Sequence, residues 1–214
     1  MDKKRLRILV YVVGMFILAL GLTLNTKANL GVSPIISVPY SISQITGLNF
    51  GDLTFVVYAM FVVVQIIIHI RLKNHKRIAL DILQLPLSLI FTRLLNIFTV
   101  YIPTSQNLGI RFIILTFAII CTGFGTMSLS MQIVPNPGDG IVQALAERFD
   151  KSVGITKNLF DCLNLSITLC ISLFIAHQIV GVGIGTVIAV VGVGRVIALF
   201  HHIFESKIEY LIFD

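Results

Sequence analysis

Pro34–Thr46 reads PIISVPYSISQIT, an apolar stretch of thirteen residues, and a second stretch of the same length, PGDGIVQALAERF, occupies Pro137–Phe149. Thirteen residues form a helix of about 20 Å, whereas the hydrocarbon core of a bilayer is about 30 Å thick. Each stretch opens with proline, which suits the first turn of a helix, and follows a residue type that caps helices, Ser33 or Asn136. We therefore predict two short helices that are either re-entrant or interfacial.

Six longer apolar runs surround these stretches, and each is long enough to cross a bilayer as a helix. The runs are Ile8–Leu24, Leu53–Ile70, Ile82–Ile102, Phe112–Val134, Asn158–Ala176 and Ile179–Phe200. We expect the first to be a retained span and not a signal peptide, because no clear cleavage site follows it. The predicted fold class is an all-α polytopic membrane bundle with six transmembrane helices.

The composition agrees with this fold class. Of the 214 residues, 56% are apolar and 12% are charged, which is about half the charge of a typical soluble chain. The mean hydropathy is +0.96. Such a chain lacks the polar side chains that would cover a water-soluble surface, so we expect the lipid bilayer to be its main partner. Its basic residues lie in short clusters between apolar runs, a pattern that argues against a nucleic-acid partner.

The positions of the basic residues predict the orientation in the membrane. If the N-terminus is cytoplasmic and the short helices do not cross, twelve of the sixteen lysines and arginines lie on the cytoplasmic side and two lie outside. This distribution follows the positive-inside rule. If Pro34–Thr46 crossed alone, the basic cluster Arg71–Arg77 would move outside and the bias would collapse. We therefore expect both termini in the cytoplasm.

The order long span, short helix, long span, long span occurs twice. A shift of 103 residues places Pro34 on Pro137 without a gap. Each half contributes three crossings, an odd number, so the second half enters the membrane in the opposite sense. This pattern predicts a 3+3 inverted repeat, with residues 1–107 as the first membrane repeat and 108–214 as the second, within one structural domain. Inverted repeats are typical of secondary transporters, which bind their solutes near the bilayer midplane.

Polar and charged side chains at membrane depth are the candidate solute-binding residues, because such groups are costly in lipid and usually face the interior of a bundle. Arg93 and Arg195 occupy the last spans of the two halves, where they either line a path for a carboxylate or snorkel to headgroups. Asp161 lies in the fifth span and either carries a proton or forms a charge pair within the bundle.

The starts of the two short helices supply the other candidates. The helix N-termini at Ser33 and Asn136 direct positive dipole ends at an anion or carbonyl. Asp139 either caps its own helix or contacts the solute. The predicted substrate-binding residues are Arg93, Arg195, Asp161, Asp139, Ser33 and Asn136. We expect no cofactor and no metal site.

Two glycine-rich segments carry a resemblance to a known family. Thr26–Gly51 (TKANLGVSPIISVPYSISQITGLNFG) and Gly183–Phe200 (GIGTVIAVVGVGRVIALF) resemble the corresponding segments of the YczE/YyaS/YitT-like bacterial membrane proteins. The tryptophan and aspartate that many members carry after the first proline are missing beyond Pro34, and an aspartate follows the second proline instead, as Asp139. The resemblance implies a multi-pass protein of the bacterial plasma membrane, in a family mostly of unassigned activity.

These observations favour a transporter for a small anionic or zwitterionic solute. Two alternatives stay open: a non-transporting membrane scaffold or accessory protein, and a substrate-capture subunit of an ATPase-coupled transporter. An enzyme is not expected, because neither an HExxH metal motif nor a Gly-x-Ser-x-Gly nucleophile turn is present. A homo-oligomer or an unidentified membrane partner is compatible with the sequence.

Overall fold

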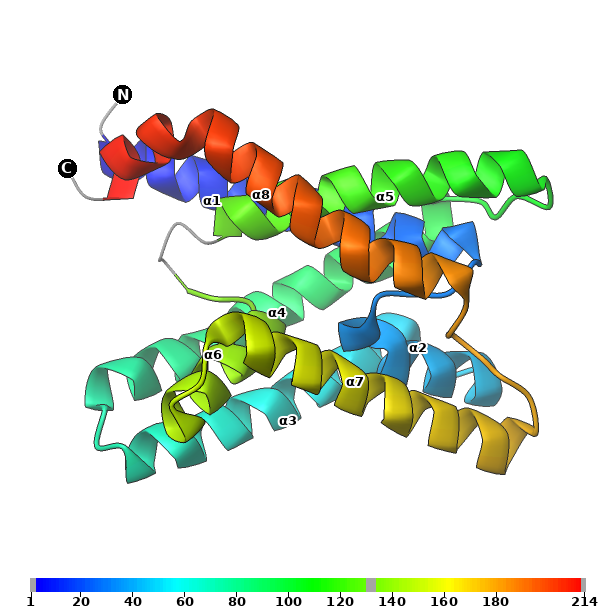
Figure 1. The fold of residues 1–214 in the computed structure, drawn as a ribbon, viewed down its shortest axis with the longest axis horizontal. Helices are drawn as coiled ribbons and strands as arrows, with labels where there is room; N and C mark the ends of the chain where they lie inside the picture. The colour runs from blue at the N-terminus through cyan, green and yellow to red at the C-terminus, as the bar shows by residue number, and fades with distance from the viewer. Residues whose placement is uncertain (1–2, 130–133, 213–214) are drawn as a thin grey trace. The chain divides into compact units, whose positions relative to one another are not determined.

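The computed structural model describes residues 3–129 and 134–212, and this part of the chain is helical without a strand (Figure 1). The elements in chain order are α1 (Lys3–Ala28), α2 (Pro34–Thr46), α3 (Phe50–Arg71), α4 (His75–Tyr101), α5 (Leu108–Leu129), α6 (Pro137–Phe149), α7 (Val153–Ile171), the π-helical turn η1 (Ser172–Ala176) and α8 (Ile184–Ile212). The predicted all-α fold is confirmed.

Six of these helices are long and apolar enough to cross a membrane: α1, α3, α4, α5, α7 continued by η1, and α8. Each overlaps one of the six predicted runs. Their outer faces remain apolar, as α3 shows with exposed Val56, Met60, Val63 and Ile67 at helical spacing. A helix that is apolar on its buried and exposed sides is suited to lipid. The chain is a multi-pass membrane protein.

Several predicted span boundaries differ from the helix ends. In the run Phe112–Val134 the described helix α5 ends at Leu129, residues 130–133 lie outside the described part, and Val134 is not helical. The run from Ile179 starts too early, because α8 begins at Ile184. The residues before α8 include Gly181, whose φ of 84° is left-handed and therefore incompatible with a continuous right-handed helix.

The two short helices have the predicted bounds. Asn136 caps α6 by accepting a hydrogen bond from the backbone N–H of Gly138. Both helices end in a left-handed residue, Gly47 after α2 (φ 74°) and Asp150 after α6 (φ 51°). A left-handed residue at this position turns the chain out of the helical path, so each short helix ends abruptly before the next long one begins.

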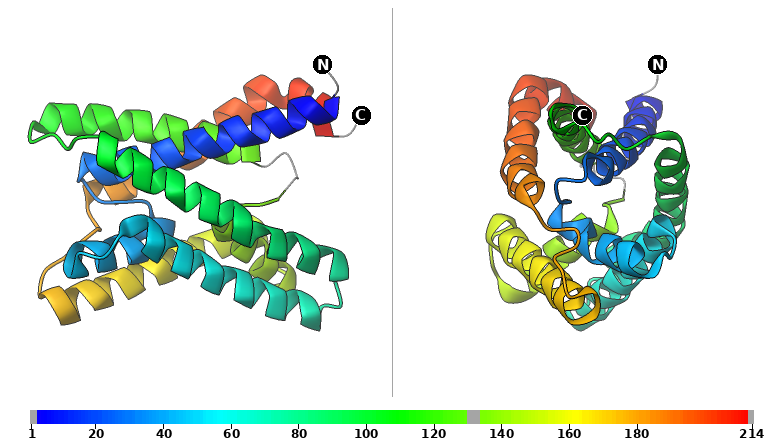
Figure 2. Two further views of the ribbon diagram at one scale, coloured as in Figure 1. Left: turned by 180° about the vertical axis from the view of Figure 1, so that it is seen from behind. Right: turned by 90° about the vertical axis from the view of Figure 1, so that its right-hand side faces the viewer.

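The helices form two compact units. The first contains α1, α5, α8 and the last turns of α4. Here α1 and α5 run antiparallel and side by side (Figure 2). Glycines permit this approach: a Cβ at Gly21 would lie 2.6 Å from the backbone nitrogen of Thr122, and a Cβ at Gly125 would lie 2.6 Å from that of Leu18. Small residues at membrane helix interfaces let backbones pack in this way.

The second unit contains α2, α3, α4 as far as Arg93, α6, α7 and η1. Its short helices are packed reciprocally, since α2 lies against α7 and α6 lies against α3 (Figure 1). An apolar cluster of Ile141, Val142 and Phe160, with Phe61 against it, joins α6 to α7 and α3. This unit holds the polar side chains described next.

Candidate functional site

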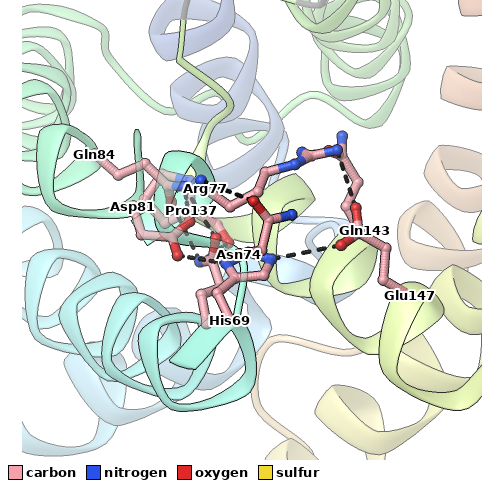
Figure 3. A network of polar contacts seen from close by, with 9 residues as sticks. His69, Asn74, Arg77, Asp81, Gln84, Pro137, Gln143 and Glu147 are labelled. Carbon is pink, nitrogen blue, oxygen red and sulfur yellow. Dashed lines mark hydrogen bonds and ion pairs between the residues drawn. The ribbon is translucent and has the colours of Figure 1, made fainter. Parts of the chain in front are cut away.

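Four buried polar side chains face one another across the hairpin of α3 and α4. Gln65 and His69 lie one turn apart on α3, Asp81 and Gln84 lie one turn apart on α4, and each is at most 3% exposed. The short connection 72–74 folds α4 back along α3, which brings the two pairs together (Figure 3). Polar groups buried in a membrane-spanning helix pair are costly unless they bond to one another.

The four side chains form a continuous hydrogen-bonded network. His69 Nδ1 lies 2.6 Å from Asp81 Oδ2. The other carboxylate oxygen, Oδ1, accepts a bond of 3.3 Å from Gln84 Nε2. Gln84 and Gln65 also bond to each other in both directions, at 2.9 and 3.2 Å. The network fixes the rotamers of all four side chains and holds the imidazole in one orientation.

The first turn of α6 lies directly on this network. Gln65 Nε2 donates a hydrogen bond of 3.3 Å to the backbone oxygen of Pro137. Gly140 is packed so tightly against the glutamines that a Cβ there would collide with Gln65 Oε1 and lie 3.0 Å from Gln84 Nε2. Glycine at position 140 therefore lets the short helix contact the amides without displacing the Gln65 side chain.

The last turns of α6 contact the same hairpin nearer its connection. Glu147 Oε1 forms an ion pair of 3.0 Å with Arg77 Nη2, and Glu147 Oε2 lies 3.7 Å from His69 Nε2. Arg77 also donates to Gln143 Oε1 at 3.5 Å. His69 Nε2 is buried without a hydrogen-bond partner. One imidazole nitrogen is thus satisfied by Asp81, while the other faces a carboxylate that it does not yet bond.

A second set of polar side chains lies around the N-terminus of α6. Asp139, in the first turn, lies 3.8 Å from Lys157 Nζ on α7, and both side chains are partly exposed. The hydroxyl of Tyr58 is fully buried, and the side chains of Asn136 and Asp139 lie near it. The N-terminus of α6 is therefore surrounded by the buried hydroxyl of Tyr58 and by the loose ion pair of Asp139 and Lys157.

The contacts of α6 show how it lies along α3. Its start, at Asn136, is beside Tyr58 in the middle of α3, and its last turn, at Glu147, is beside His69 near the end of α3. Both intervals are eleven residues, or about 16 Å of helix. The short helix therefore runs along half the length of a membrane-spanning helix. This placement favours the re-entrant alternative over the interfacial one.

The predicted arginines lie in different surroundings. Arg93 forms an ion pair of 2.8 Å with Asp52 at the start of α3, and both side chains are about half exposed. Arg195 is an exposed residue of α8, in the first unit. Neither belongs to the network around α6.

The predicted candidates at the helix starts are only partly brought together. Asn136 and Asp139 lie at the N-terminus of α6. Asp161 of α7 lies near enough to Asp139 and Lys157 to interact with them electrostatically. Asp139 was expected to cap its helix or contact a solute; in the structure Asn136 is the cap, and Asp139 faces Lys157. Ser33 belongs to the first unit, where its backbone N–H donates 2.7 Å to Asn25 Oδ1.

Sequence reasoning missed Gln65, His69, Asp81 and Gln84. The predicted run Ile82–Ile102 begins one residue after Asp81, and the predicted run Leu53–Ile70 contains Gln65 and His69, neither of which is among the predicted candidates. The available signal was spacing: two polar residues four apart near the end of one run, and two polar residues three apart just after a short connection. Such spacing places each pair on one helix face.

Among the described residues, no group of three or more His, Cys, Asp or Glu side chains is arranged to hold a metal ion.

Comparison with known proteins identifies a family. Residues 5–202 match the family described as "Family of unknown function (DUF6198)". The match covers most of the chain, so the protein belongs to the DUF6198 family. No curated protein and no solved structure matches the chain.

Proposed function

We propose that this protein is a bacterial plasma-membrane transporter for a small zwitterionic or anionic solute. One observation carries the proposal: the N-terminus of the short helix α6 lies halfway along a membrane-spanning helix and is surrounded by Tyr58, Asp139 and Lys157. Helix ends at membrane depth expose unpaired backbone groups, and these survive only when they are buried in protein or line a wet cavity. Transporters place their solutes at such ends.

The charges at this helix start favour a zwitterion over a simple anion. Lys157 Nζ and Asp139 Oδ1 are 3.8 Å apart, a separation longer than a charge-assisted hydrogen bond. A solute with an ammonium and a carboxylate group satisfies both side chains by entering between them. The buried hydroxyl of Tyr58 supplies a further donor for the carboxylate. An anion alone would compete with Asp139 for the lysine.

The capping residues support the inverted repeat on which this proposal draws. Asn49 caps α3 by accepting from the N–H of Asp52, and Ser152 caps α7 by accepting from that of Ile155. A shift of 103 residues places Asn49 on Ser152 and Asp52 on Ile155, so the capping residues and their donors both correspond. Two halves with matching helix starts and opposite entry are what an inverted-repeat transporter requires.

The packing of the short helices follows the same shift. Ser37 Oγ of α2 bonds to Thr168 Oγ1 of α7 at 2.7 Å. The shift relates these residues to Gly140 and Gln65, which form the close contact of α6 with α3. Each short helix is therefore held by the long helix of the other proposed half.

The predicted orientation, with both termini in the cytoplasm, places the turns after α2 and α6 on opposite sides of the membrane. A single cysteine at Leu48 or Ser152, in a background without Cys121, Cys162 and Cys170, tests this prediction. We expect an impermeant maleimide to label position 48 from outside the cell and position 152 only after permeabilisation. Labelling of both from the same side would refute the inverted repeat and the transport proposal with it.

Uptake into proteoliposomes tests the function itself. The purified protein is assayed with radiolabelled amino acids and betaines as zwitterions, and with small carboxylates as anions. We expect uptake of at least one zwitterion, and we expect Lys157→Gln or Asp139→Asn to abolish it. Lys151→Gln is the matched control, because Lys151 is exposed in the turn between α6 and α7. Folded protein that accumulates no member of either class, or variants with unchanged uptake, would contradict the proposal.

The resemblance to the YczE/YyaS/YitT-like proteins and the expectation that the chain is not an enzyme stay predictions. They are consistent with transport, since the proposal assigns no covalent chemistry to the chain.

A further inference from the structure

The two ring nitrogens of His69 have different surroundings. Nδ1 lies 2.6 Å from the carboxylate of Asp81, and when Asp81 is ionised it can only accept, so we assign the proton of this bond to Nδ1. Nε2 is buried, has no hydrogen-bond partner, and faces Glu147 Oε2 at 3.7 Å (Figure 3). A neutral imidazole with its proton on Nδ1 therefore presents a lone pair to a carboxylate, an unfavourable contact in a buried site.

One added proton removes this conflict. When a proton from water binds Nε2, the ring becomes a cation that donates one N–H to Asp81 and a second N–H toward Glu147. The proton comes from a hydronium ion, whose O–H bond breaks as the N–H bond at Nε2 forms, and one water molecule is left. Before protonation, the lone pair of His69 Nε2 on α3 faces the Glu147 carboxylate on α6. After protonation the two groups form an ion pair, which draws Glu147 Oε2 closer to Nε2 than 3.7 Å.

The charged groups around His69 come from α4 and α6. From α4, Asp81 bonds to Nδ1, and Arg77 holds the other oxygen of Glu147 at 3.0 Å. From α6, the carboxylate of Glu147 lies 3.7 Å from Nε2, and within the described part of the chain no other charged side chain of α6 pairs with the ring. Two carboxylates and one guanidinium leave this cluster one positive charge short of balance, and a protonated imidazole supplies that charge.

We propose that His69, held by Asp81, is a proton-binding site that controls how tightly the last turns of α6 are held to α3. In a transporter this proton would be the coupling ion, a role that rests on the transport function proposed above. The proton site and the proposed solute site lie at opposite ends of the same helix, at Glu147 and at Asn136. A change in the attachment of one end is therefore transmitted to the other by a single rigid element of thirteen residues.

Proton binding can be measured without knowing the solute. The chain has no tryptophan, so Phe149→Trp places a single reporter at the exposed end of α6. The indole ring has no group that titrates in this range. Acrylamide quenching of the full-length protein in nanodiscs is followed across the range in which histidines titrate, roughly pH 5 to 8. We expect quenching to increase reversibly as the pH rises, because loss of the proton loosens α6.

Two variants and one control decide the assignment. His69→Gln keeps a donor for Asp81 but cannot take up a proton, and we expect it to lose the pH response. Glu147→Gln is the second variant; Glu147 is about one-third exposed, so its replacement is tolerated by the fold, and we expect the same loss. His75→Gln changes an exposed histidine at the start of α4 and leaves the response intact. A response that survives in either variant, or no response in the parent protein, would overturn the proposal.

The transport proposal and the proton-site proposal can be refuted independently of each other. Solute uptake by a protein whose α6 shows no pH response leaves transport standing and removes the proton site. A pH response that depends on His69, in a protein that accumulates no solute, keeps the proton site and removes transport.

Discussion

Replacing Gly140 by alanine tests whether α6 docks on the buried amides. The new Cβ collides with Gln65 Oε1, so the Gln65 amide must move. Moving it breaks its bonds to Gln84, at 2.9 and 3.2 Å, and to the backbone oxygen of Pro137, at 3.3 Å. The steric cost itself is small because the amide ends a flexible side chain. The cost of Gly140→Ala lies in the hydrogen bonds.

The magnitude follows from two opposing effects. Each buried polar group left unsatisfied costs about 1–3 kcal/mol, and alanine gains about 1 kcal/mol over glycine as a helix former. With the Gln84 amide and the Pro137 carbonyl weakened together, we expect a net loss of about 2 kcal/mol. At about 2–4 °C per kcal/mol for a chain of this size, Tm falls by about 4–8 °C.

The assay is thermal unfolding of the purified protein in detergent, followed by circular dichroism. Gly154→Ala, at the start of α7, is the control, since nothing lies within 4 Å of a Cβ there; its Tm should stay the same or rise slightly. Adding Gln65→Ala to Gly140→Ala removes the collision, so the double variant should lose less than the sum of the two single losses. A Gly140→Ala protein that unfolds at the parent temperature would show that α6 does not lie on this network.

Three further predictions concern packing elsewhere. Gly125→Ala should lower the stability by about 1–3 kcal/mol, because the Cβ would meet backbone that cannot swing aside; Gly194→Ala, with open space around it, should be neutral in the same unfolding assay. Ser37→Ala and Thr168→Ala should show a coupling of about 0.6 kcal/mol in a double-mutant cycle, the average for hydrogen bonds between membrane helices; strictly additive losses would exclude that bond. Arg93→Gln should change the stability by no more than about 1 kcal/mol, since its ion pair is half exposed; a loss of several kcal/mol would mean that this arginine is buried in the membrane-embedded protein.

The short helices could be predicted from sequence because their boundaries are set locally. A proline at the first position and a turn after thirteen residues fix Pro34–Thr46 and Pro137–Phe149 without reference to any other part of the chain. The long spans could be found for a similar reason, since continuous apolarity is a local property. Their ends were less certain: α4 begins at His75 because a helix continues beyond the apolar run that identifies it.

The site could be predicted only at the start of α6. Asn136 and Asp139 stand next to a proline and a glycine, and that local pattern signals a helix start. The bond between His69 and Asp81 depends instead on how α4 turns back along α3, and the contact of Gln65 with Gly140 joins residues far apart in the chain. Arg93 was predicted as a candidate because it is a charge in an apolar run. Its ion-pair partner, Asp52, lies at the start of another helix, α3, so the local sequence around Arg93 could not predict the pair.

The reciprocal packing of α2 has a consequence for biogenesis. Ser37 and Thr168, which join α2 to α7, are 131 residues apart. At a synthesis rate of about 5–20 residues per second, the ribosome needs roughly 7–26 s to make the partner of a helix that has already left it. During that interval the nascent α2 can pack only against α3, which follows it directly in the chain, and its bond to α7 forms last, when the later helix arrives.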